Sequence, residues 1–513
     1  MLTIFPGNVA GLHVDEAWIF ARVKELAAGA HHINGMNGYT GALHQYLLYP
    51  VFEIFGYRLE VLRIACAFFN TLAILFAMLC VRVLHSGKNL HLLVGLLLCT
   101  FPVFVTQARF CIELTCLNPL LTFAGLYLLA KAVHSGRSRR RMALAAAGGA
   151  CLGLAAYNHI IGITLPLALF ATVVVFYRRE LFKNLGGVLC VAAGFFMGFF
   201  PRLISYVSSF LHHSRGGRIS GEGHFRLFNF LPDITHVPAV FSGIWDGGLV
   251  FLRVTGKNLV PVLPYVTVSM IALLFVNLFW LKTRPSRRDS AMLFGAFLFV
   301  LAIMVITPGL AIQYFELPSL FLPYFLVRLV APLLEKGSKV QRGIGMAAMG
   351  LILSLNLLYV SADYFAEFCM TKGTIGVFRL GNRIMETSNH FVDVENLHRQ
   401  ITGRDITVVA SLYPIVLPLW VYDLPIKTLR FVSFTNASPG ADSFPDASKK
   451  MAIIFYNGPT PALNAVWIRK PEVMNPPAGD SIRAGPLLFR RDETFDRHFR
   501  VFVAVRGQTG GGR

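Results

Sequence analysis

Charged residues are scarce in this sequence. Only 14% of its 513 residues are Asp, Glu, Lys or Arg, whereas 55% are hydrophobic. A single water-soluble core cannot account for so large a share of hydrophobic residues. The composition therefore excludes an ordinary soluble globular protein. Internal repeats and coiled-coil heptads do not stand out either, which argues against a solenoid or a long zipper.

Cysteine is also sparse in the parts that would face water. The eight cysteines lie mostly inside apolar stretches, and the final part of the chain has only Cys369 near its border. No disulfide framework is indicated. The first twelve residues lack the basic start of a cleavable signal. As a helix they would cover about 18 Å of a hydrocarbon core about 30 Å thick. We therefore expect a short or incomplete first span.

Long apolar runs dominate the rest of the chain. A transmembrane helix needs about 20 apolar residues. Ten stretches approach this length: 59–84, 90–106, 114–133, 142–157, 160–177, 185–207, 259–281, 291–311, 314–334 and 343–360. The sequence therefore predicts an α-helical polytopic membrane protein of about eleven spans, the first one short.

The net charge of +20 is concentrated in short connectors between these runs. The basic connectors are those around residue 88 and at 137–141, 178–183, 282–288 and 336–342. Short loops rich in Lys and Arg stay cytoplasmic, so the charge marks membrane topology and does not indicate nucleic acid as a partner. Basic clusters on both sides of 142–177 require an even number of crossings, and we expect a hairpin that turns outward at Asn158 and His159.

Two domains follow from this pattern. Residues 1–361 are predicted to form the membrane domain, with an outward juxtamembrane loop at 13–57 and a mobile, glycine-rich outward loop at 208–258. Amphipathic helices are expected at 16–28 and 42–55. Residues 362–513 are predicted to form a small extracytoplasmic α/β domain, with a helix at 380–401 and strands at 405–412, 427–434, 451–456 and 499–505.

Polar side chains gather at the outward ends of several predicted spans. They are Asp15 and Glu16, Arg109 and Glu113, Asn158 and His159, and Gln313 with Tyr314. Ionisable groups at membrane depth are costly unless they are paired or functional, so a shared side suggests a site.

Each of these signals also has an ordinary explanation, which the residues alone leave open. Asp15 and Glu16 suit the first turn of a helix. Arg109 and Glu113 are spaced for an i,i+4 pair. His159 fits an interfacial turn.

The order of the motifs resembles the polytopic glycosyltransferases of the glycosyltransferase C superfamily. This superfamily includes the dolichyl-phosphate-mannose protein mannosyltransferases and the bacterial aminoarabinose and lipopolysaccharide-core transferases. The motifs are Val14-Asp15-Glu16-Ala17-Trp18, Gly41-Ala42-Leu43-His44-Gln45-Tyr46-Leu47, Ile54-Phe55-Gly56-Tyr57, Leu62-Arg63-Ile64, Phe101-Pro102, Gly153-Leu154-Ala155, Gln313-Tyr314 and Leu317-Pro318. The resemblance covers residues 11 to 334 in order. The family often has Lys where His159 stands, and Arg where Gln313 precedes Tyr314.

The resemblance implies transfer of a sugar from a polyprenyl-phosphate donor to an acceptor hydroxyl on the outer face of a bacterial inner membrane. An essential outward Asp of the family corresponds to Asp15. Removing a proton from the acceptor requires a general base, which we assign to Asp15. Glu16 or Glu113 would orient the acceptor or hold Asp15 in place. The acceptor would be a lipid, a glycan or a protein.

The leaving group of such a reaction is a lipid phosphate whose negative charge grows in the transition state, so donors of positive charge should face it. Arg109, His159 and Arg63 are the candidates. Tyr314 and Asn158 are candidates for substrate binding. No cofactor is certain, although Asp15, Glu113 and His159 offer ligands for a divalent metal.

A transporter or flippase for a lipid-linked sugar is the main alternative. Transporters usually place charged groups near the bilayer midplane on broken helices in paired halves. Neither paired halves nor charges deep within the spans are expected here, which favours the enzyme. A noncatalytic assembly protein is a third possibility.

Overall fold

The computed structural model divides into two compact units. The first comprises Met1–Gly7, Arg22–Leu252 and Gly256–Cys369, and the second comprises Asn8–Ala21, Arg253–Thr255 and Met370–Arg513. The structure describes residues 14–35, 39–85, 89–107, 111–214, 272–281, 285–306, 314, 316–361, 406–411, 450–456, 481–484, 487–493 and 499–504. The expected first span at 1–12 and loop at 208–258 lie outside these residues, except for the end of α9.

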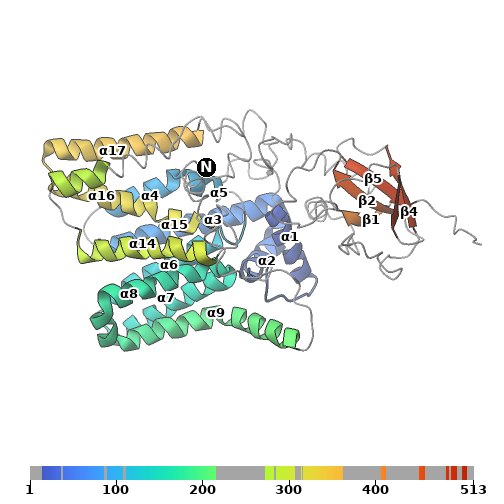
Figure 1. Ribbon diagram of the computed structural model, residues 1–513, viewed down its shortest axis with the longest axis horizontal. Coiled ribbons are helices and arrows are strands. Elements are labelled where there is room, and N and C mark those ends of the chain that lie inside the picture. Colours follow the sequence, from blue (N-terminus) through green and yellow to red (C-terminus); the bar gives the residue numbers. More distant parts are fainter. Residues whose placement is uncertain are drawn as a thin grey trace, which may run out of the picture. The chain divides into compact units, whose positions relative to one another are not determined.

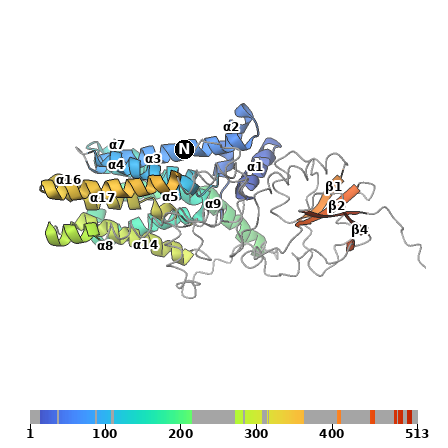
Figure 2. The same cartoon turned by 90° about the horizontal axis from the view of Figure 1, so that it is seen from above.

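Long helices lie side by side in the first unit (Figures 1 and 2). Six are long and apolar enough to span a membrane among the described residues: Leu59–Leu84, Ile160–Lys183, Leu185–Ser208, Arg287–Ile306, Glu316–Glu335 and Lys339–Ser361. Large apolar side chains such as Phe196 and Phe200 are exposed on them, as lipid contact requires. The described chain is thus mostly helical and has the character of a multi-pass membrane protein.

The predicted spans agree closely with the helices. Helices α3, α6, α7, α8, α9, α14 and α17 cover Leu59–Leu84, Leu117–Val133, Ser138–Asn158, Thr164–Lys183, Leu185–Ser214, Arg287–Ile306 and Lys339–Leu358. The expected turn at Asn158 is present, because α7 ends there and the 3-10 helix η1, Ile160–Ile163, leads into α8.

Two predicted spans are broken. The run 90–106 divides into α4 (Leu90–Thr100) and α5 (Pro102–Gln107), because proline disfavours helix at the residue before it and lacks an amide proton. The run 314–334 divides into α15 (Glu316–Ser319) and α16 (Leu322–Lys336). Of the run 259–281, only the last part is described, including the π-helix η3 at Val276–Trp280.

Small residues bring α7 and α9 together. A Cβ added to Gly149 would meet the carbonyl oxygen of Val191, and one added to Gly153 would meet that of Phe195. Reciprocally, a Cβ on Gly194 would meet the oxygen of Ala146. Close backbone approach of this kind is how membrane helices gain van der Waals contact without a hydrophobic driving force.

The amino-terminal elements match the expected amphipathic helices. Helix α1 spans Val14–Ala27, and α2 spans Leu43–Phe55 with Pro50 inside. Helix α2 buries His44, Gln45, Leu48 and Phe52, while Ile54 and Phe55 are exposed. The chain before α2 is joined to the hairpin turn, because Gly41 donates its backbone N–H to Asn158 O at 2.9 Å.

The second unit contains a five-stranded sheet among its described residues. The strand order is β1-β2-β5-β4-β3, with β1 and β2 parallel and the other pairs antiparallel. The strands are β1 Ile406–Ser411, β2 Lys450–Tyr456, β3 Ser481–Ala484, β4 Leu487–Asp492 and β5 Phe499–Ala504. Three match predicted strands, whereas β3 and β4 were not predicted. The predicted helix at 380–401 and strand at 427–434 lie outside the described residues.

Candidate functional site

A buried hydrogen-bond network joins three elements of the helical unit. Gln45 of α2 donates from Nε2 to the Glu113 carboxylate at 3.1 Å. Asn158, the last residue of α7, donates from Nδ2 to the backbone oxygen of Glu113 at 3.0 Å and to Asn118 Oδ1 at 2.6 Å. Glu113 and Asn158 are both buried, so these bonds satisfy groups that would be costly to leave unpaired.

The turn after α7 follows from local backbone conformation. His159 is extended, with φ of −148° and ψ of 130°, and this ends the helix. Two glycines let neighbouring backbone come close. A Cβ on Gly41 would meet the carbonyl oxygen of Tyr157, and one on Gly162 would meet the backbone of Ala155. Main chain from residues 41 and 162 therefore packs closely against the last turn of α7.

His159 is neutral in this environment. Its Nδ1 accepts a hydrogen bond from Ile161 N–H at 3.3 Å, which leaves the ring proton on Nε2. Burial, with a smaller contribution from the charge of Arg202, lowers the pKa of His159 to about 3. The ring lies 5.4 Å from that of Tyr39 and 6.0 Å from that of Tyr314. His159 was expected to supply positive charge, whereas its lowered pKa favours a neutral ring.

The guanidinium of Arg202 was not among the predicted site residues. Arg202 is fully buried in α9 and donates from Nη2 to Tyr157 O at 2.9 Å and from Nη1 to Asn34 Oδ1 at 3.3 Å. It also lies over the rings of Tyr157 and Tyr206. The signal was in the sequence, since an arginine inside an apolar run is rare without a role.

Glu316 was also missed. It is fully buried at the start of α15, two residues after Tyr314. Neither of its carboxylate oxygens has a hydrogen-bond partner within the part of the chain that the structure describes. A buried carboxyl group in that condition is a candidate for substrate contact. Glu316 lies near the start of the predicted span 314–334, and Arg202 lies five residues before the end of the predicted span 185–207.

The other predicted residues are placed less completely. Glu16 is buried in α1, whereas only the backbone of Asp15 is described. Arg63 is buried in α3, four residues after the helix begins. Arg109 and Gln313 lie outside the described residues. The structure thus brings together Glu113 with Asn158 and His159 with Tyr314, and leaves the suggested metal ligands Asp15, Glu113 and His159 untested.

The arrangement has the parts of a site for an anionic substrate with a hydroxyl partner. Glu113 offers an oriented carboxylate, His159 offers an Nε2–H donor, and Arg202 offers a fixed positive charge. Groups held in this way away from water act strongly on charge that develops during a reaction, because they need little reorganisation.

Comparisons with known proteins give a likeness of fold. ArnT from Cupriavidus metallidurans bound to undecaprenyl phosphate matches with a TM-score of 0.55 and 14% identity, over 99% of this chain and 96% of that one. The same protein in the apo state matches with a TM-score of 0.54 and 15% identity, over 98% and 95% of the two chains. An apo oligosaccharyltransferase from Archaeoglobus fulgidus gives a TM-score of 0.47 and 13% identity, over 82% and 62%.

Sequence comparisons add no closer relative. Neither a protein-family model nor a curated protein matches this chain. The chain shares the fold of ArnT along nearly its whole length.

Proposed function

We propose that this chain is a membrane glycosyltransferase that moves a sugar from a polyprenyl-phosphate donor to an acceptor hydroxyl on the outer face of the membrane. The supporting observation is the fold shared with ArnT, which was solved with undecaprenyl phosphate, over 99% of this chain. The buried network around Glu113 adds a site with suitable chemistry. The surrounding membrane would be the bacterial inner membrane.

The proposed reaction is a single displacement at the anomeric carbon. Asp15 removes the proton of the acceptor hydroxyl, as the resemblance implies, and Glu16 or Glu113 orients the acceptor. The acceptor oxygen forms the new bond while the bond to the phosphate oxygen breaks, which inverts the configuration. The electron pair stays on the polyprenyl phosphate.

Cationic and neutral donors share the task of stabilising that phosphate. Arg109 and Arg63 remain proposed partners, and the buried guanidinium of Arg202 joins them. His159 contributes as a neutral Nε2–H donor, because its pKa of about 3 keeps it uncharged at physiological pH. Asn158 and Tyr314 would complete the substrate contacts.

The experiment follows free polyprenyl phosphate released by purified protein in nanodiscs from a panel of polyprenyl-phosphate sugars. We expect release only when a suitable acceptor is present, and loss of release in Asp15→Asn with the protein still folded. Glu180→Gln is the matched control, because Glu180 is an exposed carboxylate in the basic part of α8. The control should keep full activity.

The same material tests the transporter alternative. In proteoliposomes, a transporter would move the lipid-linked sugar between leaflets and release no polyprenyl phosphate with any acceptor. That result would contradict the proposed transfer reaction. Reporter fusions that place the Asp15 loop and the Asn158 turn on opposite faces of the membrane would do the same. Transfer activity that persists in a strong chelator would show that the reaction does not require a divalent metal.

A further inference from the structure

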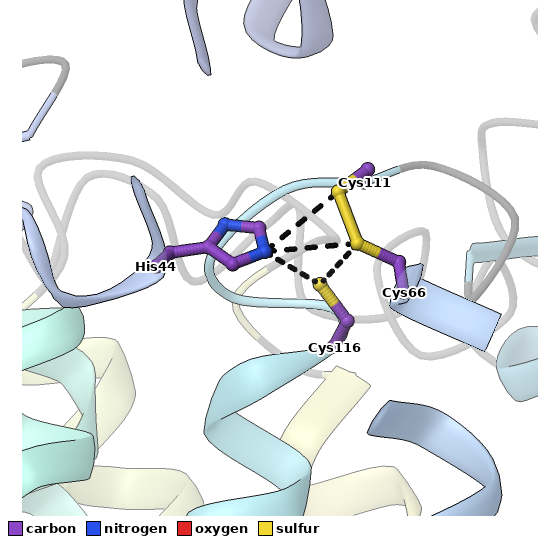
Figure 3. A group of neighbouring side chains, drawn as sticks. All are labelled: His44, Cys66, Cys111 and Cys116. Atoms are coloured by element: carbon purple, nitrogen blue, oxygen red, sulfur yellow. Dashed lines mark hydrogen bonds between the residues drawn. A yellow bond between two sulfur atoms is a disulfide. The ribbon is translucent and has the colours of Figure 1, made fainter. Parts of the chain in front are cut away.

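Four metal-ligating side chains from three elements meet in the helical unit, and three of them are close in sequence to Gln45 or Glu113. His44 comes from α2, Cys66 from α3, and Cys111 and Cys116 from the segment that leads into α6. All four are completely buried. Their ligand atoms lie within 4.8 Å of one another, and Figure 3 shows the imidazole pointing at the three sulfur atoms.

The distances from the imidazole nitrogen to the three sulfur atoms suit a tetrahedral site. His44 Nε2 lies 3.6 Å from Cys66 Sγ, 3.7 Å from Cys111 Sγ and 3.5 Å from Cys116 Sγ. With Zn–S of about 2.3 Å and Zn–N of about 2.0 Å, a tetrahedral angle at the metal gives an N to S edge of about 3.5 Å. The imidazole nitrogen therefore already stands at one vertex of such a tetrahedron.

Hydrogen bonding alone does not account for this convergence. One imidazole nitrogen carries either a single proton or a single lone pair, and sulfur is a weak donor and acceptor. It cannot serve three sulfur atoms at nearly equal distances. A cation at the centre of the group would interact with all four ligand atoms at once.

We propose that His44, Cys66, Cys111 and Cys116, with the cysteines in their thiol form, bind one Zn²⁺. Binding to three thiols and a neutral imidazole releases three protons and transfers no electrons. The Cys116 thiol gives up its hydrogen bond to Ile112 O, which measures 2.9 Å in the structure. Four protein ligands leave no open position for water, so the site is structural.

This zinc would hold the candidate functional site in shape. His44 immediately precedes Gln45, and Cys111 and Cys116 flank Glu113 on either side in the sequence. The ligands thus fix both partners of the Gln45–Glu113 hydrogen bond. The inference stands apart from the proposed transfer reaction, because metal content is measured without any substrate.

The structure also joins Cys66 and Cys111 by a disulfide, which the sequence had not indicated. Formation of that bond removes two electrons and two protons from the thiols, and a disulfide does not supply two thiolates. The zinc form and the disulfide form are therefore exclusive states of the same cysteines. This exclusivity makes the proposal easy to test.

The test measures zinc by elemental mass spectrometry in full-length protein purified in detergent with a phosphine reductant. The phosphine converts a disulfide to two thiols and becomes the phosphine oxide with oxygen from water. We expect one zinc per chain, and a fall of at least tenfold in Cys116→Ser and in His44→Gln. Cys190→Ser is the control, since Cys190 lies in α9 and belongs to no such group among the residues that the structure describes. It should keep its zinc.

A second measurement does not depend on the variants folding. Wild-type protein stripped of zinc and loaded with Co²⁺ should show thiolate-to-metal charge-transfer absorption and the visible bands of a tetrahedral ion. Absence of zinc from the reduced wild type, unchanged zinc in folded Cys116→Ser and His44→Gln, or copper or iron in its place would each overturn the proposal. So would a quantitative Cys66–Cys111 crosslinked peptide in protein isolated from cells without reductant after alkylation.

Discussion

The two ends of the helical unit treat polar groups differently. At the end with the α7 turn, Glu113, Asn158 and Arg202 are buried. Asn158 donates a hydrogen bond to Glu113 O, and Arg202 donates one to Tyr157 O in α7. At the basic end, Arg287 pairs with Glu180 at 3.2 Å with both side chains about half exposed. Basic residues in exposed connectors mark topology, whereas ionisable groups buried among membrane helices are costly unless they are paired or functional. The same residue types therefore carry different energetic weight at the two ends.

A second pair at the basic end is more sheltered. Arg328 of α16 lies 2.7 Å from Asp289 of α14, and each side chain is a little more than a quarter exposed. Arg288 donates to Leu84 O at the end of α3. These contacts join helix ends to each other but reach no buried network among the described residues. We expect them to tolerate substitution better than the site end does.

The sharpest way to separate the two ends is to remove one carboxylate charge from each. Glu113→Gln keeps an oxygen acceptor for Gln45 but removes the negative charge. We expect sugar transfer to fall by about 10²–10⁴-fold if the carboxylate orients the reacting acceptor. Asp289→Asn at the basic end should leave the rate within about twofold. The measurement is release of polyprenyl phosphate in nanodiscs, and equal losses in both variants would remove the distinction.

Truncating the buried cation should cost the fold as well as the reaction. Arg202→Met removes donors to Tyr157 O and Asn34 Oδ1. Hydrogen bonds to charged groups contribute about 1.5–3 kcal/mol, so the thermal midpoint in detergent should fall by several degrees. Arg202→Lys keeps the charge and should restore part of the loss. A midpoint unchanged in Arg202→Met would show that the network does not hold α9.

Acid should destabilise the site end through His159. Its pKa is lowered to about 3 in the folded chain, mainly by burial. The unfolded chain binds a proton below pH 6.5, so stability is greatest above that value and falls as the pH decreases toward 3. At pH 5 the cost is about 2 kcal/mol. His159→Gln should flatten the melting profile between pH 7 and pH 5.

His85 provides the matched control for that profile. Its pKa is also lowered, to about 4, by burial and by Arg328 and Arg288, but the residue is only half buried at the basic end. His85→Gln should therefore change the acid dependence less than His159→Gln does. A larger change from His85 would reverse the comparison between the two ends.

The smallest effect is expected for the sheltered ion pair. Arg328→Met removes the contact with Asp289 and should lower stability by about 1 kcal/mol or less, since partly exposed ion pairs contribute little. The loss should shrink further in high salt. A thermal midpoint that drops as far as in Arg202→Met would contradict the view that the basic end is tolerant.

Local elements were predictable from the sequence because the hydrophobic pattern decides them. Helix α3 begins and ends at the predicted residues, and the hairpin at Asn158 followed from charge at both of its ends. The breaks at Phe101 and before Leu322 were not predicted, since each run looked continuously apolar. Strands β3 and β4 are short and contain arginine, so neither gives a clear strand signal in the sequence.

Most contacts between residues far apart in the chain could not be predicted from the sequence. Gln45 and Glu113 are 68 residues apart, and nothing in either segment names the other. The alternation of basic connectors predicted that Glu113 and Asn158 lie on one side of the membrane but did not pair them. A cysteine within an apolar run gives no separate signal, so the sequence does not group Cys66, Cys111 and Cys116 with His44. Buried groups reveal their roles only when the packing is known.

The short segment before α2 is joined to the turn after α7 by main-chain hydrogen bonds in both directions. Gly41 donates to Asn158 O, and Ile160 donates to Tyr39 O at 3.0 Å. Bonds of this kind do not depend on side-chain identity, so substitutions at residues 39–41 that keep the backbone conformation leave this connection in place. The main chain before α2 thus forms part of the wall beside the His159 ring, which also contacts Tyr39.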